Sequence, residues 1–442
     1  MKNEHIIPRI LEQLNLGHSI CTDSRLAAKG DIFLALQGEQ FDGNHFAQKA
    51  IEAGCQLAII DDENFRYDDR YLLTCNVLEL LHELGRAHRK KFHTPVLGIT
   101  GSNGKTTTKE LTHAVLSSVF SIHATRGNLN NHIGVPLTIL SWRPPLDICI
   151  VEMGANHVGE IKQLCSIAKP GYGLITNIGK AHLEGFGSVE NIARAKSELY
   201  EHVRQGAGTL FVNYDSHILH KLSQGAKVVT YGQSDDCHCQ GRITSTSPFV
   251  HVKFWVNKRF GKAKAGIKGL VESRLTGAYN MENILAAITI GLYFGVAPEK
   301  VAAAISAYEP LNHRSQIINT GKNVVLMDAY NANPTSMVAA LHNFSEFNVR
   351  KKAVMLGDML ELGSYASEEH LKIVEQTERM QLDVRMFVGD AFSAVCQPDN
   401  QTQVFKDVEQ AKLWIKDNPL DDFHILIKGS RGIQMEKLLT HL

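Results

Sequence analysis

The residues best suited to chemistry form a glycine-containing loop between a predicted strand and a predicted helix. Segment 96–100, VLGIT, is apolar and rich in β-branched residues, and it leads directly into GSNGKTTTKE. Backbone N–H groups of such a loop can bind phosphates at a helix N-terminus, the lysine can reach the β- and γ-phosphates, and the next hydroxyl can ligate Mg²⁺. The candidate phosphate-binding residues are Gly101, Ser102, Asn103, Gly104, Lys105, Thr106 and Thr107.

This loop differs from the common phosphate-loop pattern G-x-x-x-x-G-K-[ST] at its first position. Ile99 stands where that pattern has glycine, so the loop has the shorter form G-x-x-G-K-T. The strand, loop and helix nevertheless follow one another in the order that phosphate binding needs. That context favours phosphate binding over an ordinary connecting loop.

Three further residues of the middle region could carry chemistry. Glu152 ends the apolar run DICIVE, where a carboxylate could face a nucleotide-bound cation or be a solvated loop residue. His182 and Lys196 follow the apolar run YGLITNI, and their spacing alone assigns neither of them a role. At this point the alternatives for all three residues stay open.

Polar residues also stand at the ends of later predicted elements. Asn280 and Asn283 share one face of a predicted helix, where they could bind a base or ribose, or cap the helix. Asp328, Asp358 and Lys428 each end an apolar run in the last third of the chain. Three strand ends of this kind predict one ligand-facing rim, although each residue singly could be a turn residue.

The elements that must position these residues predict an α/β fold. Apolar strand-like runs alternate with helical patterns, which is typical of mostly parallel sheets. The pattern of apolar runs, helical segments and turn signals changes twice along the sequence. It predicts three domains, at 1–92, 93–309 and 310–442. Segment 226–275 differs from its surroundings, since its short alternating runs predict an antiparallel flap.

Composition excludes several function classes. The 442 residues include 46 Lys and Arg and 46 Asp and Glu, so bulk charge gives no support for a nucleic-acid binder. The longest uncharged apolar stretch, 284–297, is too short to span a bilayer, and the first residues do not resemble a secretory signal. G-x-G-x-x-G and G-x-S-x-G are both absent, which gives no support for a dinucleotide fingerprint or a serine hydrolase.

The eight scattered cysteines predict free thiols in a reducing cytoplasm. Cys237, His238 and Cys239 form the only metal-like cluster of the sequence, and it has no second ligand pair at zinc spacing. We therefore expect a cytoplasmic protein without a zinc site, in which this cluster is an ordinary polar loop.

Seven segments, in this order, resemble the Mur ligases over nearly the whole chain. They are ITGSNGKTTTKE, GNLNNHIGVPLT, VEMGANHVGEI, ITNIGKAHLEGFGSVENIARAKSE, DAYNANPTSM, GDMLELG and KGSRG. AYNANP together with GDMLELG is similar to the branch that adds D-alanyl-D-alanine to a UDP-N-acetylmuramoyl-tripeptide. The DNPR-type motif expected of the diaminopimelate- or lysine-adding branch is absent.

The resemblance implies an N-terminal domain for the uridine nucleotide, a central ATPase and a Rossmann-like C-terminal domain. It also implies an ATP-dependent ligation in which the tripeptide carboxylate is phosphorylated and the dipeptide amine attacks the acyl phosphate. ATP and Mg²⁺ are the implied cofactors. We also expect the protein to be a monomer that neither binds nucleic acid nor inserts into a membrane.

Site residues follow from the same resemblance. The implied catalytic residues are Lys105, Glu152, His182 and Lys196, the last of them carbamylated, and the implied metal ligands are Thr106, Glu152, His182 and Lys196. Asn280, Asn283, Arg314 and Asp328 match residues that contact ATP. The implied substrate contacts are Ser24, Arg25, Asn44, Asn130, Asn131, Tyr330, Asn331, Asn333, Asp358 and Lys428.

Two other functions stay open. A ligase of the same superfamily could join a different amino acid or acceptor, and the third region would decide this because it meets the amine substrate. A nucleotide-binding regulatory protein could keep the loop without turnover. The joint presence of Lys105, Glu152, His182 and Lys196 argues against that second alternative.

Overall fold

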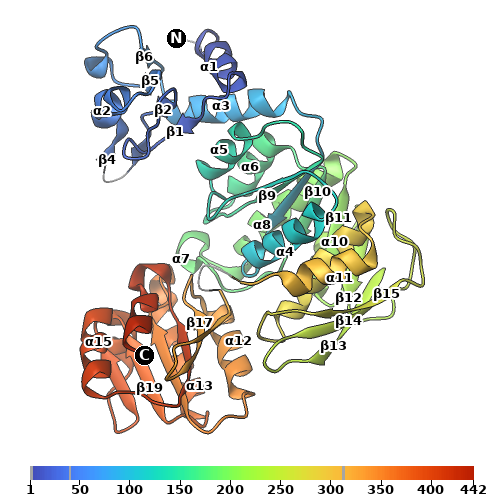
Figure 1. Cartoon of the computed structure of the whole chain (residues 1–442), viewed down its shortest axis with the longest axis vertical. Coiled ribbons are helices and arrows are strands. Elements are labelled where there is room, and N and C mark those ends of the chain that lie inside the picture. Colours follow the sequence, from blue (N-terminus) through green and yellow to red (C-terminus); the bar gives the residue numbers. More distant parts are fainter. Residues whose placement is uncertain (1–2, 39–40, 311–313) are drawn as a thin grey trace.

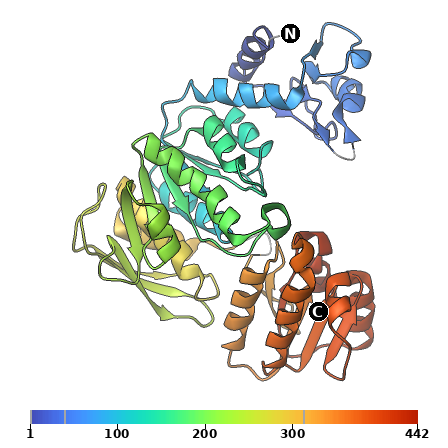
Figure 2. The same ribbon diagram turned by 180° about the vertical axis from the view of Figure 1, so that it is seen from behind.

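The computed structural model describes residues 3–38, 41–310 and 314–442, and these form three α/β lobes (Figures 1 and 2). Each lobe has its own sheet, and every sheet of more than two strands is wholly or mostly parallel. The predicted α/β class with mostly parallel sheets is therefore confirmed.

The N-terminal lobe is built on a four-stranded parallel sheet with the order β1-β2-β5-β6. Its elements are α1 (Ile6–Asn15), β1 (Ile20–Cys21), β2 (Ile32–Leu34), β3 (Gln37–Gly38), β4 (Phe41–Asp42), η1 (Gly43–Phe46), α2 (Ala47–Glu52), β5 (Leu57–Ile60), η2 (Glu63–Phe65), β6 (Tyr71–Leu73) and α3 (Val77–Arg89). Helix α3 buries Leu80, Leu81 and Leu84 in a cluster that also contains Leu140 of the next lobe, so it joins the two lobes.

The central lobe has a nine-stranded sheet with the order β15-β14-β13-β12-β11-β10-β7-β9-β8. Its elements are β7 (Val96–Thr100), α4 (Lys105–Ser117), β8 (Ile122–Ala124), α5 (Gly134–Leu140), β9 (Ile148–Glu152), α6 (Glu160–Ala168), β10 (Tyr172–Ile175), α7 (Leu183–Phe186), α8 (Val189–Gln205), β11 (Thr209–Asn213), α9 (His217–Leu222), β12 (Lys227–Gly232), β13 (Cys239–Ser245), β14 (His251–Val256), β15 (Lys268–Glu272), α10 (Asn280–Phe294) and α11 (Pro298–Ala307).

Two hydrophobic clusters hold the central sheet. Helices α4 and α10 contribute Leu111, Val115 and Ile288 to one cluster, while α6 and α8 contribute Ile161 and Leu199 to the other. Strand β12 lies within the predicted antiparallel flap at 226–275 but pairs parallel with β11, so that part of the prediction is wrong. Strands β13, β14 and β15 pair antiparallel, as predicted. They nevertheless continue the central sheet, because β13 pairs parallel with β12.

The C-terminal lobe has a six-stranded sheet with the order β16-β17-β21-β18-β19-β20, antiparallel only at β16. Its elements are β16 (Gln316–Asn319), β17 (Val324–Asp328), α12 (Pro334–Ser345), β18 (Lys352–Gly357), η3 (Gly363–Tyr365), α13 (Ala366–Glu378), β19 (Val384–Val388), α14 (Asp390–Val395), β20 (Thr402–Phe405), α15 (Val408–Asp417), β21 (His424–Lys428), η4 (Arg431–Ile433) and η5 (Met435–His441).

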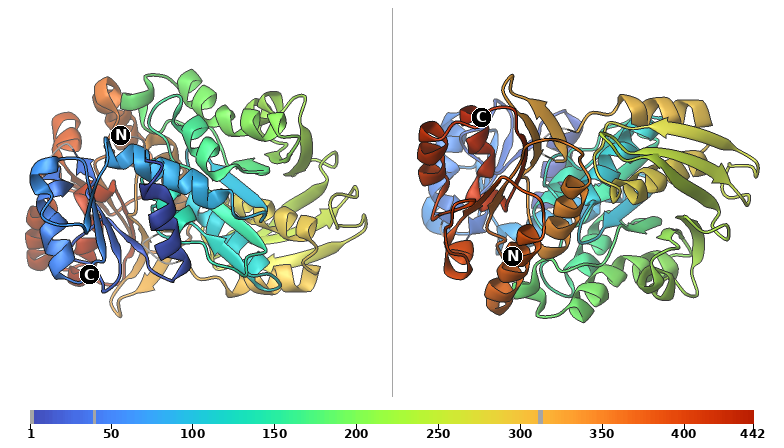
Figure 3. Two further views of the ribbon diagram at one scale, coloured as in Figure 1. Left: turned by 90° about the horizontal axis from the view of Figure 1, so that it is seen from above. Right: turned by 90° about the horizontal axis from the view of Figure 1, so that it is seen from below.

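The two outer lobes lie on the same side of the central one. In the end-on views of Figure 3 the N-terminal and C-terminal lobes overlap, and β13–β15 project on the opposite side. Figure 1 shows the same two lobes at opposite ends of the molecule's long axis. No helix in the described ranges is long and apolar enough to cross a membrane.

Candidate active site

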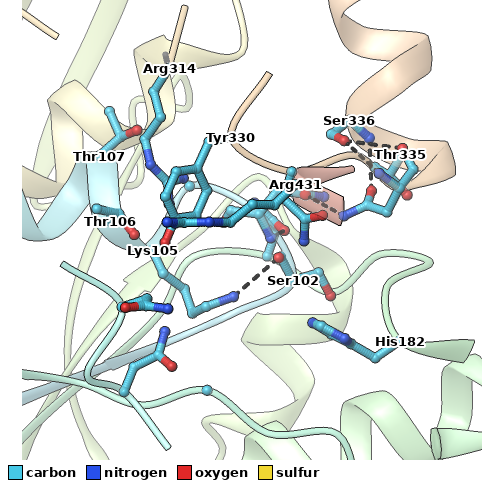
Figure 4. Close-up of a pocket in the computed structure, with 18 of the residues that line it drawn as sticks. Ser102, Lys105, Thr106, Thr107, His182, Arg314, Tyr330, Thr335, Ser336 and Arg431 are labelled. Carbon is cyan, nitrogen blue, oxygen red and sulfur yellow. Dashed lines mark hydrogen bonds between the residues drawn. The ribbon is translucent and has the colours of Figure 1, made fainter. Parts of the chain in front are cut away.

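A polar cavity of about 750 Å³ lies where the central lobe meets the C-terminal lobe (Figure 4). Both lobes contribute to its wall, so residues far apart in the sequence face one space. The sequence-predicted residues that line it are Ser102, Asn103, Gly104, Lys105, Thr106, Thr107, Asn130, Asn131, Glu152, His182, Asn280, Asn283, Arg314, Asp328, Tyr330, Asn331, Asn333 and Lys428.

The phosphate-type loop is held rigidly between β7 and α4. Gly104 has φ +75°, and a Cβ there would stand 2.5 Å from the side-chain oxygen of Asn283, so the position requires glycine. The Ser102 hydroxyl donates to the carbonyl of Gly179 at 2.9 Å. The backbone N–H of Asn103 donates to Asn177 Oδ1 at 3.0 Å. These contacts tie the loop to the segment after β10.

Lys105 lies inside the loop in this structure. Its Nζ donates to the carbonyl of Gly101 at 2.7 Å and to that of Ser102 at 3.2 Å, as Figure 4 shows in part. Burial lowers the pKa of the Lys105 ammonium, and the Glu152 carboxylate partly opposes that shift. A phosphate would replace weak carbonyl partners with a charged one, which strengthens each hydrogen bond.

Thr106 and Glu152 place two oxygen atoms that could ligate a metal ion side by side. The Thr106 hydroxyl donates to Glu152 Oε1 at 3.2 Å, and Asn130 Nδ2 donates to the same oxygen at 2.8 Å. The Glu152 side chain is 1% exposed, and its Oε2 has no hydrogen-bond partner among the described residues. A buried carboxylate with an unused oxygen beside a hydroxyl suits Mg²⁺, which prefers such ligands.

His182 faces the C-terminal lobe. Its backbone has φ +53°, and its Nδ1 pairs with the carboxylate of Glu361, which follows β18. The hydrogen bond from His182 lowers the pKa of the Glu361 carboxyl. The imidazole therefore lines the cavity while it also links the two lobes.

Lys196 lies behind the cavity and does not line it. Its side chain is about 1% exposed, its Nζ stands 5.7 Å from the centroid of the Phe186 ring, and no carboxylate among the described residues pairs with it. Burial lowers the pKa of Lys196 well below its ordinary value, and the charge of Lys105 adds to this effect. The neutral amine is the form that this environment favours.

The two asparagines of α10 connect this helix to α4. Asn283 Nδ2 donates to Asn280 Oδ1 at 2.8 Å, and Asn283 Oδ1 accepts from the Thr108 hydroxyl at 3.0 Å. Asn280 Nδ2 donates to the carbonyl of Thr276 at 2.8 Å. Both residues line the cavity, but their amides are largely used within the protein.

On the C-terminal side, charged groups gather at strand ends. Lys428 Nζ donates to Asp328 Oδ2 at 2.6 Å, and the two residues face each other across neighbouring strands β17 and β21. The Arg314 guanidinium lies 3.6 Å from the centroid of the Tyr330 ring, and that of Arg431 lies 5.3 Å from it. This stacking holds two cations at the cavity wall (Figure 4).

Hydrogen bonds join the loop directly to the C-terminal lobe. Asn333 Nδ2 donates to Asn103 Oδ1 at 2.7 Å, although the two residues are 230 positions apart. The backbone N–H of Lys180 donates to the Thr335 hydroxyl at 3.0 Å. The loop that is predicted to bind phosphate is therefore in direct hydrogen-bond contact with the C-terminal lobe.

Six sequence-predicted residues do not line the cavity: Gly101, Lys196, Ser24, Arg25, Asn44 and Asp358. The carboxylate of Asp358 accepts from the backbone N–H groups of Ala391 and Phe392, both at 2.9 Å, so it holds the start of α14. The Asn44 amide donates to Asp42 and Asp61, both at 2.8 Å. Their polar atoms are thus occupied within the protein.

Ser24 and Arg25, which are predicted to bind the uridine nucleotide, belong to the N-terminal lobe and do not line this cavity. Arg25 is exposed and forms an ion pair with Asp23 at 2.6 Å, while Ser24 is 8% exposed. The hydrogen bond from Arg25 lowers the pKa of Asp23 to about 2. Arg25 therefore lies at the surface of the N-terminal lobe, Ser24 is buried beside it, and neither residue lines the cavity of the phosphate-type loop.

The cavity-lining residues that sequence reasoning missed include Asn177, Glu361 and Arg431. Glu361 lies within GDMLELG and Arg431 within KGSRG, so both belong to segments that were already singled out. Their roles depend on contacts with Tyr330 and His182, which no local spacing reveals.

Comparisons with known proteins match all three lobes. Residues 17–88 match the model of the Mur ligase family catalytic domain, 99–291 the Mur ligase middle domain, and 313–431 the Mur ligase glutamate ligase domain. The UDP-N-acetylmuramoyl-tripeptide--D-alanyl-D-alanine ligase of Bacillus subtilis is 32% identical, with 96% of this chain and 93% of that protein covered. The protein of the same name from Escherichia coli is 30% identical over 96% of this chain and 93% of its own length.

Solved structures give the same result. A crystal structure of MurF from Acinetobacter baumannii has a TM-score of 0.82 and 30% identity, with 96% of this chain and 92% of that one covered. MurF ligase from Thermotoga maritima, solved in complex with ADP, has a TM-score of 0.83 at 24% identity and covers 97% of both chains. The second likeness supports the fold.

Proposed function

This chain belongs to the Mur ligase family, and from that premise we propose that it joins D-alanyl-D-alanine to a UDP-N-acetylmuramoyl-tripeptide with ATP. The product is a precursor of peptidoglycan. The observation that carries the proposal is the cavity between two lobes, where Lys105, Thr106 and Glu152 meet Arg314 and residues of the C-terminal lobe. Relatives of at least 30% identity over almost the full length support the choice of amine and acceptor.

The chemistry explains why this site concentrates cations. A carboxylate oxygen of the tripeptide attacks the γ-phosphorus of ATP, which gives an acyl phosphate and ADP. The amine of the dipeptide then attacks the acyl carbon, and the tetrahedral intermediate releases phosphate and a proton as the amide forms. Lys105 and Arg314 would offset the repulsion between the two anions and the charge that develops in transfer.

Thr106 and Glu152, whose oxygens are 3.2 Å apart, would hold the proposed Mg²⁺. When bound, such an ion polarises the phosphoryl group and neutralises charge. The proposal includes His182 and Lys196 as further ligands. His182 pairs with Glu361 through Nδ1, so Nε2 is the nitrogen that would bind the cation, and both contacts can be kept together.

Carbamylation of Lys196 fits its environment. The lowered pKa of Lys196 favours the neutral amine, whose lone pair can form an N–C bond with CO₂ as a proton is released. The resulting carbamate offers oxygen ligands to a hard cation, whereas an ammonium would repel it. This supports the assignment of Lys196, although the side chain lies just outside the cavity in this structure.

The substrate contacts are proposed by lobe. The domains 1–92, 93–309 and 310–442 would hold the uridine nucleotide, ATP and the dipeptide, respectively. Ser24 and Arg25 would contact the nucleotide, Asn130 and Asn131 the muramoyl-peptide, and the remaining residues the dipeptide: Tyr330, Asn331, Asn333 and Lys428. Asn44 and Asp358 would act by shaping the lobes, because their polar atoms are already used. We further propose a cytoplasmic monomer.

The test is a ligation assay with ATP, Mg²⁺ and the UDP-tripeptide, in its diaminopimelate and lysine forms. Phosphate release that needs D-alanyl-D-alanine, with a UDP-pentapeptide found by mass, is the expected result. Release with a single amino acid but not with the dipeptide would reassign the amine substrate and leave the ATP site intact. Nucleotide binding without any release would favour a protein that has lost turnover.

A further inference from the structure

Lys109 is a fully buried lysine that the proposed reaction does not use. It lies on α4 one turn after Lys105, and its side chain is 0% exposed. Its Nζ donates to the carbonyl of Thr125 at 2.6 Å and pairs with Glu110 Oε1 at 2.9 Å. Burying an ammonium is costly, so its position calls for a compensating role.

The same ammonium faces the proposed metal ligand from behind. Lys109 Nζ stands 3.9 Å from Glu152 Oε2, the oxygen without a hydrogen-bond donor in the described part of the chain. The other oxygen, Oε1, meets Thr106 and Asn130 at the cavity. The carboxylate is therefore oriented from two sides, by neutral donors in front and by one cation behind.

Thr125, which follows β8, connects the lysine to the backbone of Glu152. Its carbonyl accepts from Lys109, and its hydroxyl accepts from the backbone N–H of Glu152 at 3.0 Å. One residue thus positions both partners of the ion pair. Such a closed set of contacts restricts the rotamers open to a ligand side chain.

We propose that Lys109 is a positioning residue that holds Glu152 in the orientation in which it can ligate a divalent cation beside Thr106. The inference rests on the proposed function only in that Glu152 binds a cation. It concerns cation binding and not ligation itself, so it can be tested with the nucleotide alone.

The test uses Lys109→Met, which keeps the length and removes the charge. ADP affinity is measured by calorimetry with Mg²⁺ and again with EDTA, and the ratio gives the Mg²⁺ advantage. We expect the variant to lose about tenfold or more of that advantage, as is typical when a residue behind a metal ligand is removed. Affinities for ADP in EDTA and for the UDP-tripeptide should stay unchanged, which a general loss of structure would not allow.

An unchanged or larger Mg²⁺ advantage would overturn the proposal. An increase is what simple loss of a nearby positive charge would produce, since Lys109 then only repels the cation. Glu110→Gln is the matched control, because Glu110 contacts Lys109 from the more exposed side and leaves the links to Thr125 and Glu152 in place. It should keep the Mg²⁺ advantage of the wild type.

A second measurement covers a failure to fold. Lys109→Met leaves Glu152 without its cation, so the melting temperature should fall, and Lys109→Met/Glu152→Gln should recover it. If neither variant folds, or the double variant recovers nothing, Lys109 does not act through Glu152 and the proposal fails. Absence of ligation by the wild type would refute the proposed function and leave these binding measurements valid.

Discussion

At the scale of single residues, Lys196 shows how burial selects the chemistry of a side chain. It is almost fully buried, has no carboxylate partner among the described residues, and has a pKa lowered by burial. A lysine in that state destabilises the fold at neutral pH, because the unfolded chain binds the proton more tightly. The same state makes the amine reactive toward CO₂.

We therefore predict that Lys196→Met is inactive in ligation yet more stable than the wild type in CO₂-free buffer at pH 7. An unpaired polar group in the interior costs about 1–3 kcal/mol of stability, and the apolar side chain of methionine removes that cost. The wild type gains stability as pH rises through the range between the lowered pKa and about 10.4, so the difference should narrow there. Denaturant unfolding at several pH values measures the difference in unfolding free energy between the variant and the wild type. If that difference does not depend on pH, Lys196 does not have the lowered pKa that we assign to it.

Glu152 gives a second prediction at this scale. Glu152→Ala should lower turnover by about 10²–10³-fold, the range typical for loss of one electrostatic contact to a transition state. Binding of the UDP-tripeptide should change little, because its uridine end is assigned to another lobe. Equal losses in turnover and binding would indicate a structural role instead.

Glu282 provides a matched control for that experiment. It also lines the cavity, where partial burial raises the pKa of its carboxyl, and glutamine keeps the size of the side chain while it removes the charge. Glu282→Gln should keep nearly full turnover in the assay that Glu152→Ala fails.

The phosphate-type loop was predictable at the residue scale, while several single contacts were not. Glycine, lysine and threonine at fixed spacing carry their own chemistry, and the structure brings Lys105 and Thr106 to one cavity. Asp358 was predicted to contact substrate, yet its oxygens accept from residues more than thirty positions later. Partners that far away leave no trace in local spacing.

At the scale of elements, the junction of loop and α4 depends on Gly104. Gly104→Ala should cost about 1–2 kcal/mol of stability from the left-handed backbone alone. It should also weaken ADP binding, because the new Cβ would meet Asn283 at 2.5 Å and push the loop from its position. Denaturant unfolding and calorimetry with ADP measure the two effects.

Gly225 is the control for the stability cost of placing alanine in a left-handed backbone conformation. It has φ +76°, close to the value at Gly104, and nothing lies within 4 Å of a Cβ placed there. Gly225→Ala should lose similar stability and keep ADP affinity. If ADP affinity fell equally in both variants, the loop would have no special role.

Most elements followed from hydrophobic period and capping residues. The predicted strand at 96–100 is β7, and the uncharged apolar stretch at 284–297 largely coincides with α10, which is buried over most of its length. What the sequence left undefined was how the flap joins the sheet, because the β12–β13 pairing involves only two residue pairs. So short a pairing carries no periodic signal of its own.

At the scale of the whole molecule, we expect the lobes to move during the reaction. The N-terminal and C-terminal lobes lie at opposite ends of the long axis in Figure 1, on the same side of the central lobe. Reacting atoms must come within about 3–3.5 Å. We predict that an ATP analogue and the UDP-tripeptide together reduce the radius of gyration in small-angle scattering, and that neither does so fully alone. No change with both present would contradict closure.

The contacts between lobes could not be predicted from the sequence. Asn103 and Asn333 are 230 positions apart, and the pairing of His182 with Glu361 brings together two different lobes. Each of these residues belongs to a segment with its own local explanation. Only the packing of two separately folded sheets brings them to one cavity.

The most direct test of the central claim follows the carboxylate oxygens through one reaction. UDP-tripeptide labelled with oxygen-18 in its terminal carboxylate is incubated with ATP, Mg²⁺ and D-alanyl-D-alanine, and phosphate and peptide are analysed by mass. We predict one labelled oxygen in the released phosphate and one in the UDP-pentapeptide. Pentapeptide formed with unlabelled phosphate would contradict the acyl phosphate, and phosphate released without pentapeptide would contradict the ligase itself.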